Sequence, residues 1–466
     1  MRLEMKLTNI EEVNQENNLE SILQNLQKGE LINIILEISE DYSDIEKRLL
    51  FKYADNKDEL AASKKLIREY INNAKRSGFI DWRHVDQAVQ GAEMTLEKAQ
   101  EKIKSGQTES AVQLSLAVLS PVVKMLNYSD DSNGTVGDVI YSALNTVEQA
   151  VEAGIDHLND REHKKLFDSI LKEALKEYYD GWSDWRYNLL KVCTYFSAKL
   201  DLRKRLEKQL EILSQEVGKT WRSDYDQKEI KLILLQIIER NDGADKAEEY
   251  IYANIQYSDF RKNAIANESN KGDYKKVIQL CLEGEKIDRA ASKPGLVTQW
   301  QELRYLAYEN LGDIEKQRLL ARELLFHNEF QYYEILKGLY ERDEWDGVIK
   351  TIVKETEGQR VYLDIIKAEK MTSHILDYCQ QHISYVIDLY PYLIEDYLNE
   401  VNQLFVKYIE EEASEASDRR GYKNVCKIIK TYKNACGIIH SHKIIGELKQ
   451  KYPRRPALLD ELGKIK

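Results

Sequence analysis

Asn270-Lys-Gly-Asp273 and Asn310-Leu-Gly-Asp313 are two copies of one turn, and each stands between two segments with helical apolar periodicity. In such a turn the glycine ends one helix and the aspartate caps the next. Related segments are Asn241-Asp-Gly-Ala-Asp245 and Arg342-Asp-Glu-Trp-Asp-Gly347. The four glycines are 29, 40 and 35 residues apart, which brackets the period of paired-helix repeats. The spacing predicts an all-α fold, an α-solenoid of antiparallel helix pairs with degenerate tetratricopeptide-like repeats.

Helical periodicity extends on both sides of these turns. Residues 19–26 and 31–38 predict a helical hairpin interrupted at Gly29, and a third helix starts at Ser43 with Ile45, Leu49 and Leu50 facing inward. Residues 230–238 are apolar almost all round, which predicts a helix buried on several sides. Alternating apolar and polar residues are scarce, and there are only five prolines, so strands have little support.

These patterns divide the chain into four regions. We expect an N-terminal helical hairpin region, an array of long helices, tetratricopeptide-like repeats with an acidic end, and basic C-terminal helices, at residues 1–56, 57–240, 241–418 and 419–466. Within the second region we expect Pro121 to kink a helix and residues 129–134 to form a loop, because that segment consists of turn-forming residues.

Length and composition agree with a repeat protein. A chain of 466 residues is too long for one compact core, whereas each unit of a solenoid packs only on its neighbours. The 29 tyrosines, 8 phenylalanines and 6 tryptophans supply ample core material, so we do not expect disorder over the whole length.

The cysteines and the N-terminal sequence indicate the compartment. Five scattered cysteines favour buried free thiols in a reducing environment rather than a disulfide framework. The first residues form no apolar signal core, and no stretch approaches about eighteen uncharged apolar residues. We therefore expect a cytoplasmic protein without a membrane span.

Charge is distributed unevenly at the C-terminal end. Residues 395–418 are strongly acidic, and residues 419–466 carry thirteen Lys or Arg against three acids. The candidate nucleic-acid-binding residues lie at helical spacing or next to a predicted helix break, and they are Arg419, Arg420, Lys423, Lys427, Lys430, Arg454 and Arg455. Such a stripe can neutralise phosphates.

Two other interpretations of these cations stay open. They solvate an exposed helix face, or they pair with the acidic segment 395–418. We favour these interpretations over nucleic-acid binding, because the first 418 residues carry a net charge of −22 that would repel duplex DNA, and no interleaved aromatic residues suggest base stacking.

Three C-terminal segments resemble the helical region of bacterial SWIM zinc-finger proteins. They are residues 386–397, 421–429 and 448–462, and the ending Tyr452-Pro-Arg-Arg-Pro-Ala-Leu-Leu-Asp-Glu-Leu462 is the most specific. Leu23-Gln-Asn-Leu-Gln-Lys-Gly-Glu-Leu-Ile32 resembles the segment that follows the finger in that family. The finger itself needs Cys-x-Cys followed by Cys-x-His, and the first cysteine here is Cys193. The resemblance therefore implies a helical body without a zinc site, with a finger-bearing chain or a Swi/Snf-type ATPase as partner.

Candidate catalytic and metal-binding groups are weak. His374, Cys379 and His382 have no obvious acid or amide to orient a base. Cys436 and His440 are one helical turn apart, but the cysteine belongs to an apolar stripe. Gly218-Lys-Thr220 lacks the first glycine of a phosphate loop and favours a surface turn. We expect no enzyme, no cofactor and no metal.

The leading functional hypothesis is a non-catalytic helical scaffold that binds a protein partner. The acidic body, the repeated turns and the absence of a catalytic constellation support it. The alternative is a nucleic-acid-binding accessory protein that acts through the basic C-terminal helices.

Overall fold

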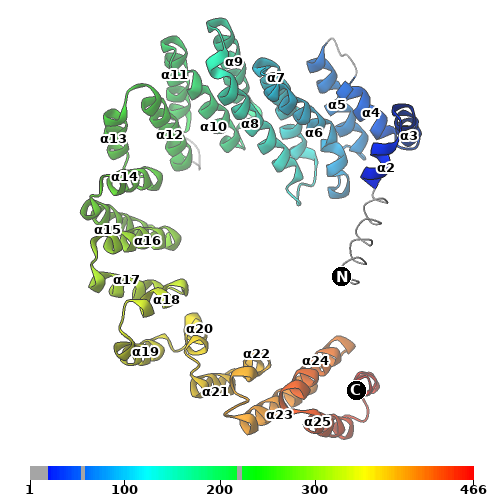
Figure 1. Ribbon diagram of the computed structural model, residues 1–466, viewed down its shortest axis with the longest axis vertical. Helices are drawn as coiled ribbons and strands as arrows, with labels where there is room; N and C mark the ends of the chain where they lie inside the picture. The colour runs from blue at the N-terminus through cyan, green and yellow to red at the C-terminus, as the bar shows by residue number, and fades with distance from the viewer. Residues whose placement is uncertain (1–18, 54–57, 218–222, 466) are drawn as a thin grey trace, which may run out of the picture. The chain divides into compact units, whose positions relative to one another are not determined.

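The computed structural model describes residues 19–53, 58–217 and 223–465. Throughout these ranges every regular element is a helix, and the only β-pairing is in two isolated bridges, Arg76 with Phe79 and Ile80 with Ser129. Successive helices pack on one another in antiparallel pairs (Figure 1). The predicted fold class, an all-α solenoid, is confirmed.

The chain forms two compact units, residues 1–257 and 258–466, here called unit 1 and unit 2. The helices of unit 1 are α2 (Leu19–Asn25), α3 (Lys28–Asp41), α4 (Ser43–Tyr53), α5 (Glu59–Ala74), α6 (Trp82–Lys104), α7 (Thr108–Met125), η1 (Leu126–Tyr128), α8 (Thr135–Gly154), η2 (Ile155–His157), α9 (Asp160–Ala174), η3 (Glu177–Tyr179), α10 (Ser183–Cys193), η4 (Thr194–Phe196), α11 (Leu200–Val217), α12 (Ser223–Asn241) and α13 (Ala244–Ala253).

Unit 2 begins at Ser258, so α13 belongs to unit 1 although the sequence placed a region boundary at residue 240. The helices of unit 2 are α14 (Ser258–Lys271), α15 (Tyr274–Ala290), α16 (Pro294–Leu311), α17 (Ile314–Phe326), α18 (Gln331–Gly338), α19 (Arg342–Thr356), α20 (Arg360–Ala368), α21 (Thr372–Gln381), η5 (Ile383–Tyr385), α22 (Val386–Leu389), η6 (Tyr390–Tyr392), α23 (Leu398–Glu415), α24 (Arg419–Cys436), α25 (Ile438–Lys451) and α26 (Pro456–Gly463).

Unit 1 has two layers of helices. In the first layer α5 packs on α7, α7 on α9, and α9 on α11, while in the second layer α6 packs on α8, α8 on α10, and α10 on α12. Sequence neighbours such as α5 and α6, or α7 and α8, join the layers (Figure 1). Each layer therefore presents one outer face made of alternate helices, and the core lies between the layers.

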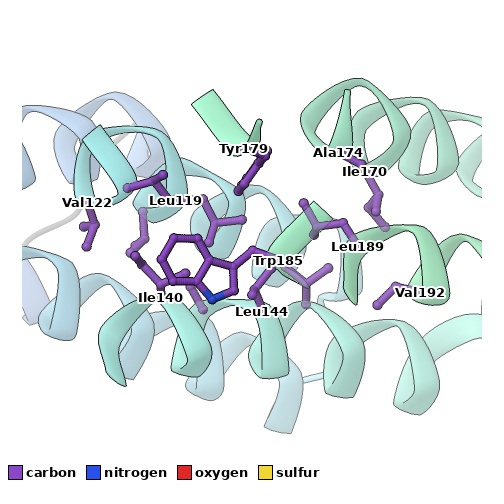
Figure 2. Close-up of a cluster of buried hydrophobic side chains, with 14 of the residues drawn as sticks. Leu119, Val122, Ile140, Leu144, Ile170, Ala174, Tyr179, Trp185, Leu189 and Val192 are labelled. Carbon is purple, nitrogen blue, oxygen red and sulfur yellow. The ribbon is translucent and has the colours of Figure 1, made fainter. Parts of the chain in front are cut away.

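The core of unit 1 is built from the facing stripes of these helices. Figure 2 shows Trp185 of α10 among Leu119 of α7 and Ile140 and Leu144 of α8. Along α12, Ile230, Ile233, Leu235 and Ile237 are all buried. The prediction of a helix buried on several sides at residues 230–238 is thereby confirmed.

The glycine-aspartate turns form as predicted at two of the four places. Gly272 and Gly312 have φ values of 76° and 68°, which a side chain would strain. The Asp273 and Asp313 carboxylates accept from the amides of Lys276 and Lys316, at 3.0 and 3.2 Å. Asp273 thus caps α15 and Asp313 caps α17.

The other two turns differ. Gly243, with φ of 90°, precedes α13, but no side chain caps that helix. The prediction of a turn at Arg342–Gly347 is wrong, because α19 begins at Arg342 and contains Gly347. The buried face of α19 includes Trp345, Ile349 and Ile352. Because Trp345 is the first of these residues, the helix has to start before it for all three side chains to lie on one face.

The N-terminal helices depart from the prediction in two ways. The first break lies at Leu26–Gln27 rather than Gly29, because the Gln27 amide donates to the Glu30 carboxylate at 2.8 Å and starts α3. Phe51 is buried against α5 and α6, whereas Ile45 and Leu50, expected to face inward, are exposed.

Helix α7 is the most apolar helix of unit 1. Among the described residues, Thr108–Tyr128 is long and apolar enough to cross a membrane by length and composition, with 56% of that window buried inside the protein. It packs against α5, α6, α8 and α9, which accounts for its hydropathy. Pro121 lies inside it, and the loop predicted at residues 129–134 follows it.

Candidate binding surfaces

The predicted cationic stripe lies on helix α24 of unit 2. Asp418 caps the helix by accepting from the Gly421 amide at 2.8 Å. One face of α24 is buried and is formed by Tyr422, Val425, Cys426, Ile428, Ile429 and Tyr432. The opposite face carries Arg420, Lys423, Lys427 and Lys430, all exposed, because spacings of three and four residues return to the same side of a helix.

The cations on this face are not neutralised locally. Arg420, Lys423, Lys427 and Lys430 form no salt bridge with any residue that the structure describes, and the same holds for the exposed Arg454. These five side chains therefore do not pair with the acidic segment 395–418, which was one of the alternatives that the sequence left open. Lys451, which was not among the candidates, does pair with Glu410, at 3.3 Å.

Two of the seven candidates have structural roles instead. Arg419 pairs with Asp460 at 3.1 Å and Glu461 at 3.5 Å and so ties α24 to α26. Arg455 lies between α25 and α26, as predicted, and donates to the carbonyl oxygens of Ala413 and Ala416 at 2.8 and 3.1 Å. Five candidates therefore remain available to a ligand.

A polar groove, which the sequence did not predict, crosses the second layer of unit 1. It has a volume of about 610 Å³ and is lined by side chains of α8, α10 and α12 together with Tyr195 of η4. We call it the amide groove, because Asn145, Asn188 and Gln236 come from three successive helices of that layer. None of the three amides forms a hydrogen bond with another described side chain or backbone group.

Aromatic and charged groups flank these amides. The Arg240 guanidinium lies 4.0 Å from the centre of the Tyr195 ring, and the Tyr195 hydroxyl donates to Glu148 at 3.4 Å. Burial and the nearby Glu148 carboxylate raise the pKa of Tyr195, so the hydroxyl stays protonated and can donate. Tyr141, at 60% exposure, stands at the edge of the groove. The groove thus offers donors, acceptors and aromatic surface together.

Sequence reasoning missed this groove because its residues are far apart in the chain. A signal was nevertheless present. Gln236 interrupts the apolar run Leu234-Leu-Gln236-Ile-Ile238, and a polar residue in such a run marks a surface that faces away from the core.

The candidate catalytic groups are not assembled. Cys379 is buried in α21, and burial raises the pKa of its thiol to about 11, which disfavours the thiolate nucleophile. His374 and His382 are exposed. Gly437, with φ of 93°, separates α24 from α25, so Cys436 and His440 are not one turn apart on one helix, contrary to the sequence expectation.

No group of three or more His, Cys, Asp or Glu among the described residues is arranged to hold a metal ion. The segment Gly218–Thr220, assigned from the sequence to a surface turn, lies outside the described residues.

Comparisons with known proteins identify the family of the chain. No curated protein matches the chain. A solved structure described as "Circular tandem repeat protein with novel repeat topology and enhanced subunit contact surfaces" is similar over 87% of this chain and 93% of its own, at 14% identity and a TM-score of 0.23. A family of unknown function, DUF6880, matches residues 14–253. Because this match spans just over half of the 466 residues, the chain belongs to the DUF6880 family.

Proposed function

We propose that the protein is a non-catalytic helical scaffold that binds a protein partner, and that the amide groove holds an extended segment of that partner. The observation that carries this proposal is a set of three amides on successive helices of the second layer, which form no hydrogen bond with any described residue. They are Asn145, Asn188 and Gln236. A side-chain amide offers both a donor and an acceptor, so it can pair with the N–H and C=O groups of a peptide backbone.

The spacing of helices suits an extended peptide. Packed helices lie about 8–10 Å apart, and an extended chain rises about 3.3 Å per residue. Amides on neighbouring helices of one layer would therefore meet about every third residue of the bound segment. Tyr141 and the Tyr195–Arg240 pair flank the amides and supply the aromatic and cationic anchors that interfaces favour.

The test uses peptides selected for binding from a displayed random library. We expect the selected peptides to bind the wild-type protein, and we expect the triple variant Asn145→Ala, Asn188→Ala, Gln236→Ala to lose at least about tenfold in affinity, because each lost hydrogen bond in a groove costs about 0.5–1.5 kcal/mol. Fluorescence anisotropy with a labelled peptide measures this.

A matched control removes three amides of unit 1 that lie outside the groove, namely Asn73, Gln87 and Asn127. The control variant should bind as the wild type does. Selected peptides that bind the groove variant and the wild type equally would exclude this site, and a library that yields no binder would count against the scaffold function itself.

The resemblance to SWIM zinc-finger proteins names the partner to try first. We propose a finger-bearing chain or a Swi/Snf-type ATPase from the same genome. Co-expression followed by size-exclusion chromatography should give a complex, and the groove variant should abolish it. Separate elution of the two wild-type chains would remove this partner.

A second candidate function, nucleic-acid binding, is favoured by the unpaired cations of α24. Arg420, Lys423, Lys427 and Lys430 face solvent on one side without a salt bridge to a described residue. Such a face can follow a phosphate backbone, and each phosphate contact adds about 0.9 to the slope of log affinity against log salt.

The salt dependence tests this candidate. The variant Lys423→Glu, Lys427→Glu should weaken binding of a duplex oligonucleotide and reduce the slope by about two. The control Lys275→Glu, Lys286→Glu changes two exposed lysines of α15 and should leave the slope nearly unchanged. An affinity that does not fall with salt would exclude nucleic-acid binding.

A further inference from the structure

The first layer of unit 1 holds a second groove with a different chemistry. It has a volume of about 620 Å³ and is formed by residues of α5, α7 and α9 and by Lys176, which follows α9. Four cations line it, Lys64, Arg68, Lys124 and Lys176, against a single acid, Glu173. We call it the cationic groove. Its charge is opposite to that of the whole chain, which is −12.

None of the four cations forms a salt bridge with a residue that the structure describes. Across the described part of the chain, the side-chain nitrogens of Lys64, Arg68 and Lys176 form no salt bridge or hydrogen bond. Lys124 makes one contact, with its ammonium 5.3 Å from the centre of the Tyr178 ring. Like charges gathered without counter-charges repel one another, so an anion bound among them would relieve this repulsion.

Glu173 supplies at most one counter-charge for the four cations. The Tyr178 hydroxyl donates to its carboxylate, and the Tyr179 hydroxyl lies 3.4 Å from the same oxygen. Burial raises the pKa of Glu173, and the two tyrosines, Lys176 and Lys124 oppose this shift only in part. One carboxylate with these partners leaves most of the positive charge of the groove uncompensated.

The remaining residues that line the groove form an apolar side, which can contact the organic part of a ligand. Leu60, Leu116 and Pro121 are apolar and lie next to the cations. Pro121, inside α7, has no amide hydrogen to donate to the carbonyl of Ala117, which also lines the groove. That carbonyl oxygen lacks the backbone donor of a regular helix and is an acceptor for a ligand hydroxyl or amine.

We infer that the cationic groove binds a small ligand with more than one phosphate group. The phosphates lie among Lys64, Arg68, Lys124 and Lys176, and the organic part lies against Leu60, Leu116 and Pro121. Ammonium and guanidinium groups are the usual protein partners of phosphate oxygens, and the volume falls within the range of small-molecule sites. This ligand site is on the opposite layer from the amide groove and does not depend on it.

Isothermal titration calorimetry at constant ionic strength tests the inference with two probes, inorganic tripolyphosphate and ATP. Both should bind at one site per chain. ATP should bind at least about threefold more tightly, because its nucleoside reaches the apolar side of the groove. Equal affinities for ATP and tripolyphosphate would overturn the proposal that the apolar side of the groove binds the organic part of the ligand. Failure of both probes to bind would overturn the ligand site as a whole.

The variant Lys64→Ala, Arg68→Ala should lower the affinity for both probes at least about tenfold. Its control is Lys204→Ala, Lys208→Ala, a pair of exposed lysines with the same four-residue spacing on α11 and no salt bridge within the described residues. The control should bind as the wild type does. An equal loss of affinity in both variants would show unspecific charge attraction and would contradict the site. Circular dichroism verifies that both variants are folded.

Discussion

At the scale of the residue, Glu369 shows how one carboxylate joins several helices of unit 2. It accepts hydrogen bonds from Trp345 Nε1 at 2.8 Å, from Lys337 Nζ at 2.9 Å and from the Tyr333 hydroxyl. Burial alone would raise the pKa of Glu369, but these donors outweigh burial and lower it below the ordinary value of 4.5. The ionised form is therefore favoured by folding.

The contribution of Glu369 to stability should therefore depend on pH in a definite direction. A group whose pKa is lower in the folded state stabilises the protein above its unfolded pKa, and this contribution is lost as the pH falls through the folded pKa. Glu369→Gln should lower the free energy of unfolding at pH 7 by about 1.5–3 kcal/mol, and the deficit should shrink below pH 4.5.

Urea unfolding between pH 3 and 7 measures the difference. Glu357→Gln, at an exposed carboxylate of the same unit, serves as control and should have little effect. A deficit for Glu369→Gln that stays constant with pH would contradict the role given to the carboxylate charge.

Close packing between α5 and α6 can be tested by a substitution at Gly91. A Cβ atom built there would lie 2.9 Å from the Leu66 carbonyl oxygen and 3.0 Å from the Ile67 Cα of the neighbouring helix. Gly91→Ala should destabilise the protein by about 1–3 kcal/mol, although alanine is the better helix former.

The matched control is Gly446→Ala in the interior of α25, where an added Cβ meets nothing within 4 Å. This substitution should stabilise by about 0.5–1 kcal/mol. Thermal unfolding measures both variants, and a stabilised Gly91→Ala protein would show that α5 and α6 do not approach as closely as described.

At the scale of the element, α15 and α16 are joined by buried polar contacts. Arg304 binds the Glu285 carboxylate with two hydrogen bonds, at 2.7 and 3.1 Å, and Trp300 Nε1 donates to Asp288 at 2.7 Å. The Arg304 and Glu285 side chains are only 12% and 8% exposed. Removal of Glu285 leaves the buried Arg304 charge without its carboxylate, and removal of Arg304 leaves Glu285 with only the more distant Arg289, at 3.8 Å.

A double-mutant cycle measures this coupling. Glu285→Ala and Arg304→Ala should each cost about 3–5 kcal/mol, and the double variant should cost clearly less than their sum. The exposed pair Lys407 and Glu411, 3.9 Å apart on α23, should couple by at most about 1 kcal/mol. Additive losses for the buried pair would mean that the two charges do not stabilise each other.

At the scale of the whole molecule, a solenoid confines damage to the neighbourhood of the damaged helix. Trp185 is 7% exposed in the core of unit 1 (Figure 2). Trp185→Ala should cost about 3–5 kcal/mol, and hydrogen exchange should increase in the described peptides of unit 1 while peptides of unit 2 keep their protection. Equal loss of protection in both units would show one cooperative core instead.

Local features were predictable because they depend on neighbours in the sequence. Helical spacing identified the fold class, and the glycine-aspartate pairs at 272–273 and 312–313 gave helix ends because both the positive φ and the cap act within a few residues. The two failures have different causes. At Gly29 the local capping contact between Gln27 and Glu30 was overlooked, and at Gly347 the burial of Trp345 against other helices moved the helix start.

The sequence by itself determined that the chain is a succession of amphipathic helices and that Arg420, Lys423, Lys427 and Lys430 share one face, since both follow from the periodicity of a helix. Only the tertiary structure decided which of the predicted cations are used internally, as Arg419 and Arg455 are. It alone assembled the amide groove and the cationic groove, because their residues come from alternate helices and meet only when those helices stack into a layer.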